Sequence, residues 1–326
     1  MVREMGEDDV RCRSLDIRVE GTVPLPDGRQ LGFAAYGPDD GDPVIWHHGT
    51  PGARGQIAPR TSRVAAERNM QVVLIERPGV GDSTSHLYEN IAGFAPDVEV
   101  VADRLGFDRF GVAGLSGGGP YTLACAHHMP DRVVAAAVLG GVSPTTGEDA
   151  PPGGIVRLAH RFNGPLTALR DPLSAVVWTA LQVAKPVDDQ AIALYARISP
   201  PKDREILTDP EMKEMFISDI NCGGKRQFKA VIYDAVLFGR HWGFEIEDLQ
   251  VPVRMWHGDA DNLVPLAHAE WMADLIPDCE LTMDPGEAHL GGLDRIEDVR
   301  DTISDLWADR PGAGGNVHPI TATDEA

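Results

Sequence analysis

The segment Val112–Gly119 reads V-A-G-L-S-G-G-G and constrains the chain more than any other stretch. Ser116 stands at the centre of the pattern G-x-S-x-G. The apolar run before it predicts a buried strand, and the Ala- and Leu-rich run at 120–128 predicts a helix. A serine on a sharp turn between a strand and a helix projects its hydroxyl into open space, and glycines let the neighbouring backbone approach closely. Ser116 is therefore a candidate nucleophile, although Gly-Ser-Gly runs also occur in ordinary loops.

The bulk composition excludes several classes of protein. The chain has 326 residues, of which 43% are hydrophobic, which suffices for one large α/β domain or two small ones. Its formal net charge of −21 argues against nucleic acid and anionic membrane surfaces as partners. No apolar run approaches the roughly 20 residues that cross a bilayer, and the charged first residues do not resemble a secretory signal.

The cysteines indicate the compartment. Cys12, Cys125, Cys222 and Cys279 are scattered, with no C-x-x-C pair. This pattern favours free thiols in a reducing environment over a disulfide framework or a zinc site. We therefore expect a cytoplasmic protein.

Apolar, β-like runs alternate with helical patterns over residues 14–144 and again over 246–309. The first two runs, 15–19 and 30–35, flank a turn-rich segment and predict an antiparallel hairpin. Further strands are expected at 44–47, 72–75, 109–113, 133–139, 253–256 and 281–283, and helices near 62–69, 97–105, 120–128, 266–275 and 295–307. This alternation predicts an α/β fold with a mostly parallel, doubly wound sheet.

The alternation is interrupted over residues 145–245, which contain helical patterns at 173–183, 188–198, 211–220 and 226–238. We expect an inserted, α-helical lid there, above the carboxyl ends of the strands, where such sheets bind ligands. Residues 1–13 and 310–326 are expected to be mobile tails.

A serine nucleophile needs a base, and the base needs a carboxylate to orient it. The segment H-G-D-A-D-N-L-V-P at 257–265 offers Asp261 in a loop beyond a strand, with Asp259 as a rival. The segment D-P-G-E-A-H-L places His289 in another loop that follows a strand. Since these loops are expected at the same sheet edge as Ser116, the three side chains form a candidate catalytic triad.

The segment W-H-H-G-T-P-G at 46–52 also follows a strand. A loop of this kind can aim a backbone N–H at a developing oxyanion. We assign this role to the N–H of Thr50 and of Gly117, which opens the helix after the serine. His47 and His48 are candidate metal ligands. Adjacent side chains on a strand point to opposite faces, however, so we prefer a structural role for both and expect no metal.

Five motifs together resemble the α/β-hydrolase superfamily: H-G-T-P-G (48–52), R-P-G-V-G-D-S (77–83), G-L-S-G-G-G (114–119), H-G-D-A-D-N-L-V-P (257–265) and G-E-A-H-L (286–290). They occur in the family's order. The resemblance implies a lid-bearing hydrolase without a cofactor, whose triad is Ser116, Asp261 and His289. The family's acid matches Asp261, which leaves Asp259 to stabilise the turn.

The leading interpretation is hydrolysis of a small to medium, partly apolar ester, thioester or lactone through an acyl-enzyme on Ser116. A serine at this position argues against relatives that attack with a carboxylate, such as epoxide hydrolases. A proline iminopeptidase or a carbon–carbon bond hydrolase stays possible, as does a cyclase, an acyltransferase or a ligand receptor on the same fold. The expected partner is a small acyl substrate, and the sequence leaves the oligomeric state open.

Overall fold

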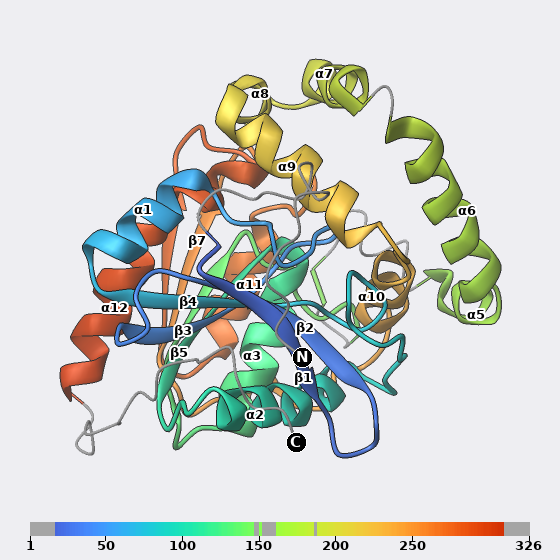
Figure 1. Cartoon of the computed structure of the whole chain (residues 1–326). Helices are drawn as coiled ribbons and strands as arrows, with labels where there is room; N and C mark the ends of the chain where they lie inside the picture. The colour runs from blue at the N-terminus through green and yellow to red at the C-terminus, as the bar shows by residue number, and fades with distance from the viewer. Residues whose placement is uncertain (1–16, 147–149, 152–160, 186–187, 310–326) are drawn as a thin grey trace.

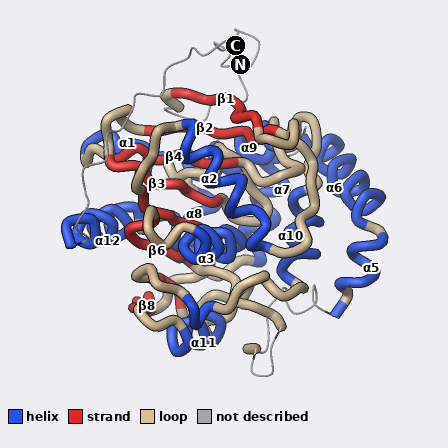
Figure 2. The backbone as a smooth tube through the Cα atoms, turned by 90° about the horizontal axis from the view of Figure 1, so that it is seen from below, coloured by secondary structure: helices blue, strands red, loops and turns tan. Residues whose placement is uncertain are grey.

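The computed structural model describes residues 17–146, 150–151, 161–185 and 188–309, and its centre is an eight-stranded sheet in the order β1-β2-β4-β3-β5-β6-β7-β8 (Figures 1 and 2). The strands are β1 (Val19–Pro24), β2 (Gln30–Tyr36), β3 (Asp42–His47), β4 (Met70–Ile75), β5 (Phe110–Leu115), β6 (Val133–Leu139), β7 (Val253–Gly258) and β8 (Cys279–Asp284). β2 pairs antiparallel with β1 and β4, and the pairs from β4 to β8 are parallel. The predicted mostly parallel sheet is confirmed.

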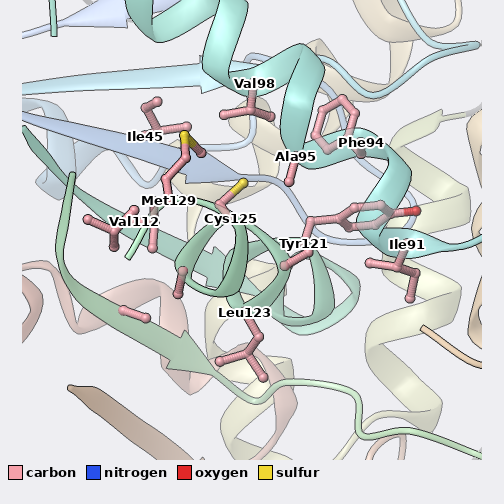
Figure 3. Packing of buried hydrophobic residues seen from close by; sticks show 14 of the residues in the cluster. Ile45, Ile91, Phe94, Ala95, Val98, Val112, Tyr121, Leu123, Cys125 and Met129 are labelled. Carbon is pink, nitrogen blue, oxygen red and sulfur yellow. The ribbon is translucent and has the colours of Figure 1, made fainter. Parts of the chain in front are cut away.

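Helices cover both faces of the sheet, because successive strand side chains point to opposite sides. On one face, Ile45 and Val112 pack in a core with residues of α2 (Ala95–Arg104), α3 (Gly119–His128) and α11 (Ala267–Leu275); Figure 3 shows part of this core. On the other face, Trp46 packs with residues of α1 (Pro59–Glu67) and α12 (Ile296–Asp309). No described helix is long and apolar enough to cross a membrane.

A helical insertion separates β6 from β7 and arches along one side of the molecule (Figure 1). Its described helices are α5 (Asn163–Ala168), α6 (Arg170–Ala184), α7 (Asp188–Ile198), α8 (Pro201–Thr208), α9 (Pro210–Gly223) and α10 (Ala230–Phe238). The sequence patterns predicted α6, α7, α9 and α10 but missed α5 and α8, which are short and contain or begin with proline. Proline is well tolerated in a first helical turn, where its missing N–H costs nothing.

Two expectations are wrong in detail. The first described strand is β1 at Val19–Pro24, where the hairpin places Pro24 directly opposite Gln30. The expected strand at 15–19 therefore ends too early, and its residues 15 and 16 lie outside the described part of the chain. A proline is tolerated in β1 since it is an edge strand. Cys125 and Cys279 are free, but Cys222 is disulfide-bonded. The expectation of free thiols is therefore wrong at Cys222, since spacing along the chain does not report which thiols a fold brings together. Cys12 and the expected tails, 1–13 and 310–326, lie outside the described residues.

A buried carboxylate joins the insertion to the core. Asp219 of α9 accepts hydrogen bonds from the backbone N–H groups of Ala53 and Gly55, each at 2.9 Å. Burial raises the pKa of Asp219 to about 7, against the lowering effect of these two hydrogen bonds. Its charged form is therefore disfavoured in the folded protein relative to the unfolded chain.

This shift predicts how stability depends on pH. The pKa of Asp219 is higher in the folded protein than in the unfolded chain. The contribution of Asp219 to the free energy of unfolding is therefore fully present below about pH 4 and is lost as the pH rises through about 7. Between pH 5 and pH 8 the wild-type protein should lose about 2.5 kcal/mol of unfolding free energy relative to Asp219→Asn. Urea unfolding at the two pH values measures the difference.

The matched control is Asp189→Asn. Asp189 is an exposed carboxylate of the insertion that pairs with Lys213 at 2.8 Å, so its replacement should leave the pH dependence of the wild type unchanged. An Asp219→Asn protein with the same pH dependence as the wild type would contradict the prediction.

Candidate active site

The carboxyl ends of four parallel strands bring the predicted site residues to one edge of the sheet. Thr50 follows β3, Ser116 follows β5, Asp261 follows β7 and His289 follows β8. β3 and β5 are neighbours, and the strand order reverses between them, since the chain runs outward from β3 to β4 and then returns to β5. A crevice at such a reversal is where open α/β sheets bind ligands.

Ser116 occupies a strained turn between β5 and α3. Its φ of +52° lies in the left-handed region, which is uncommon for any residue other than glycine. Position 118 requires a glycine, because a Cβ there would lie only 2.1 Å from the carbonyl oxygen of His47. Strain of this kind persists only where the surrounding structure fixes it, and it is concentrated at functional sites.

Ser116, His289 and Asp261 form a continuous chain of hydrogen bonds. The Nδ1 of His289 lies 2.7 Å from Oδ2 of Asp261, and its Nε2 lies 2.8 Å from Oγ of Ser116. A carboxylate only accepts, so Nδ1 carries the proton and Nε2 is free to accept the serine hydroxyl. Asp261 and His289 are both buried, each with 7% of its surface exposed. This arrangement can move a proton from the serine to the imidazole.

The carboxylate of Asp261 is itself held in place. Its Oδ1 accepts from the backbone N–H groups of Leu263 and Val264, each at 2.9 Å. The buried His257 places Nε2 3.4 Å from Oδ2. Burial alone would raise the pKa of Asp261, but hydrogen bonds from His257, His289 and Val264 together hold it well below its usual range. Asp261 therefore stays ionised, which suits a group that stabilises an imidazolium.

The rival carboxylate occupies a different place. Asp259 is exposed, and its Oδ1 accepts from the backbone N–H of Gly286 at 2.7 Å. It thus fastens the loop after β7 to the loop after β8. The structure brings Asp261, and not Asp259, into hydrogen-bond contact with His289.

The two predicted oxyanion residues lie side by side. A Cβ built on Gly117 would be 2.4 Å from Oγ1 of Thr50. The backbone N–H of Thr50 makes no hydrogen bond to another residue in the described part of the chain. The same Cβ would be 3.0 Å from Cζ of Phe238, so an aromatic ring of α10 also borders the elbow. An N–H without a partner beside Ser116 is placed to donate a hydrogen bond to a negatively charged substrate oxygen.

The two histidines before the Thr50 loop are buried and neutral. Burial and the nearby Arg77 charge lower the pKa of His47 to about 3 and that of His48 well below its usual range. The Nε2 of His48 accepts from the backbone N–H of Arg77 at 3.3 Å. Among the described residues, no group of three or more His, Cys, Asp or Glu side chains is placed to hold a metal ion.

Sequence reasoning missed the contribution of the insertion to this site. Asp203 of α8 accepts from the backbone N–H of Leu290, next to His289, at 2.8 Å. Asp234 of α10 forms a buried ion pair with Arg77 at 2.8 Å and accepts a hydrogen bond from Thr50 at 2.5 Å. No spacing rule links these insertion residues to the loops they contact, so only the three-dimensional structure reveals them.

The chain is similar to known proteins in sequence and in fold. A proline iminopeptidase of Arabidopsis thaliana is 32% identical over 123 residues, 37% of this chain, and the match covers only 32% of the plant protein's own length. A poly(3-hydroxyalkanoate) depolymerase of Ectopseudomonas oleovorans is 25% identical over 73% of this chain and 75% of the relative. An esterase structure from Exiguobacterium antarcticum superposes with a TM-score of 0.63 at 18% identity, covering 87% of this chain and 98% of that one, which shows a shared fold.

A family model described as the alpha/beta hydrolase fold matches residues 42–295. That range includes the strand ends and all four site loops described above. The chain therefore belongs to the α/β-hydrolase fold family.

Proposed function

We propose that the protein is a serine hydrolase that cleaves a carboxylic ester, thioester or lactone through an acyl-enzyme on Ser116. The observation that carries the proposal is the unbroken Ser116–His289–Asp261 hydrogen-bond chain at the sheet edge. Its acid is buried and held in the ionised form, and its serine is exposed enough to meet a substrate. The membership in the α/β-hydrolase fold family supports a hydrolase reaction.

The first half-reaction makes the acyl-enzyme. Oγ of Ser116 attacks the acyl carbonyl carbon while Nε2 of His289 takes the hydroxyl proton. The negative charge that develops on the carbonyl oxygen is received by the N–H groups of Thr50 and Gly117, each worth roughly 3 kcal/mol of barrier. His289 then donates its proton to the departing alkoxide or thiolate, and Asp261 stabilises the imidazolium in between.

The second half-reaction releases the acid. Water enters, His289 removes its proton, and the hydroxide attacks the acyl carbon. The same N–H groups hold the oxyanion again, and Ser116 recovers its proton from His289 as the intermediate collapses. No cofactor or metal takes part in these steps.

The helical insertion serves, in this proposal, as the lid over the site. α10 brings the ring of Phe238 against the nucleophile elbow. An apolar wall at this position suits the partly apolar acyl group that we assign to the substrate.

An iminopeptidase reaction is the second candidate, because the Arabidopsis thaliana relative carries that name. Such an enzyme needs insertion carboxylates to hold the substrate's amine. The insertion contains acids such as Asp188, Asp189 and Glu205, whose presence alone is no evidence for this role. Asp189 and Glu205 are exposed and paired with lysines, at 2.8 and 3.1 Å, and Asp188 accepts from Asn221 at 3.1 Å. The ester reaction is therefore preferred.

Ser116→Ala should abolish hydrolysis of p-nitrophenyl acetate and butyrate, with kcat at least about 1,000-fold lower, because the attacking oxygen is removed. Stopped-time assays of p-nitrophenol release measure the loss, and circular dichroism checks the fold.

The matched control is Ser143→Ala. Ser143 is buried and lies 2.7 Å from Nδ1 of another histidine, His268, so its loss should leave kcat within about threefold. Wild-type rates from the Ser116→Ala protein would overturn the proposed function.

Substrate preference separates the two candidates. The wild-type enzyme should turn over p-nitrophenyl esters with short to medium acyl chains with a kcat/KM at least about 100-fold above that for prolyl-p-nitroanilide, since Asp188, Asp189 and Glu205 each already have a partner within the insertion. A series of acyl chain lengths measured beside the prolyl substrate tests this. A higher kcat/KM for the prolyl compound would reverse the ranking.

A further inference from the structure

A buried ion pair lies directly behind the loop that carries Thr50. Arg77, which follows β4, and Asp234 of α10 are each only 2% exposed. Nη2 of Arg77 donates to Oδ2 of Asp234 at 2.8 Å, and Nε lies 3.1 and 3.2 Å from the two carboxylate oxygens. Two charges are buried so far from water only where fixed partners compensate them.

The hydroxyl of Thr50 completes this ion pair. Oγ1 of Thr50 donates to Oδ2 of Asp234 at 2.5 Å and accepts from Nη2 of Arg77 at 2.9 Å. Its single hydrogen and one of its lone pairs are therefore both used, which fixes the side-chain rotamer. The side chain is thus held against Asp234 and Arg77.

Arg77 fixes the backbone of the same loop. Its Nη1 donates to the carbonyl oxygen of His48 at 2.6 Å, and its Nη2 donates to that of Gly49 at 2.8 Å. From the other side, Oε1 of Gln56 accepts from the backbone N–H of Gly49 at 2.5 Å. The peptide groups preceding Thr50 are held from both sides.

Asp234 also reaches the helix that follows the nucleophile. Its Oδ1 accepts from the hydroxyl of Tyr121 in α3 at 2.7 Å, and the ring of Tyr121 lies 4.8 Å from the guanidinium carbon of Arg77. Burial and the Asp234 charge raise the pKa of the Tyr121 hydroxyl, so it remains a donor. One carboxylate of the insertion therefore connects the Thr50 loop with the helix whose first turn follows Ser116.

We infer that Asp234 is a positioning residue for the oxyanion site: through the Thr50 hydroxyl and Arg77, it fixes the Thr50 backbone N–H relative to the Gly117 N–H. The inference rests on the proposed function, because it assigns those N–H groups to the oxyanion. It makes α10 part of the apparatus that orders the transition state. Interactions that act only there raise kcat and leave substrate binding unchanged.

Thr50→Val is the sharpest test, since it replaces the hydroxyl by a methyl group without removing the Arg77 and Asp234 side chains or the backbone N–H of residue 50. We expect kcat for p-nitrophenyl butyrate to fall about 10- to 100-fold with KM within about twofold, as small misplacements of catalytic groups do. Inhibition by n-butylboronic acid, which forms a tetrahedral adduct, should weaken by the factor by which kcat/KM falls. Thr50→Ser, which restores the hydroxyl, should recover most of the lost rate.

The matched control is Thr145→Val. Thr145 also donates its hydroxyl to α10, at 2.6 Å to the carbonyl oxygen of Phe238, but not to Asp234. Its replacement should leave kcat and boronate inhibition unchanged. Asp234→Asn should reproduce the kcat loss of Thr50→Val; if it fails to fold, Thr50→Val still decides the question.

A Thr50→Val enzyme with wild-type kcat, or a Thr145→Val enzyme with the same loss, would overturn the inference. So would a loss in Thr50→Val that appears only in KM. These outcomes differ from failure of the proposed function, in which Ser116→Ala itself would retain activity. An inactive Ser116→Ala protein beside a fully active Thr50→Val protein would leave the reaction standing and remove the role of Asp234.

Discussion

The parallel pairing of β3 with β5 and of β7 with β8 is the constraint on which the site depends. Parallel strands end at the same edge, so loops far apart in the sequence are brought together without any local signal. The nucleophile elbow then adds a steric condition, since Gly118 must pass the carbonyl oxygen of His47 with no side chain between them. The positions of Ser116 and the Thr50 loop follow from this close packing of β3 against the turn after β5.

The buried Arg77–Asp234 pair adds a second constraint, between the sheet and the insertion. Removing one partner of such a pair typically costs about 3–5 kcal/mol, while replacing both by apolar residues is often neutral. The Arg77–Asp234 pair holds the Thr50 side chain and two backbone carbonyl groups in fixed positions at once. Asp219 and Asp203 make analogous contacts with backbone N–H groups near the two halves of the site. The insertion thus contacts the core at three places that border the candidate site.

Much of the candidate site could be predicted from the sequence, because local sequence patterns mark its residues. The elbow around Ser116 is marked by its glycines, and Asp261 and His289 stand in loops that directly follow apolar strands. The class of sheet could be predicted but its strand order could not, since alternating strands and helices favour a parallel sheet without giving the order of its strands. The boundaries of β1 and the existence of α8 were missed, because edge pairing and tertiary packing decide them.

The insertion contacts could not have been predicted in the same way. Asp234 is the one charged residue of the otherwise apolar helix α10 (A-V-I-Y-D-A-V-L-F), a pattern that gives no partner for it. The structure shows Asp234 2% exposed, with Arg77, Tyr121 and Thr50 around its carboxylate. The acids considered for amine binding were Asp188, Asp189 and Glu205. Asp189 and Glu205 are exposed and paired with lysines, and Asp188 accepts a hydrogen bond from Asn221. Partner choice across long sequence separations is a property of the folded chain.

The central claim is that His289 and Asp261 activate Ser116 as a nucleophile. Its most direct test is covalent labelling with a fluorophosphonate, followed by intact-mass measurement and peptide mapping. We predict one adduct per chain, located on Ser116, with a labelling rate at least about 100-fold lower in His289→Ala. An unlabelled wild-type protein, or an adduct on another residue, would contradict it.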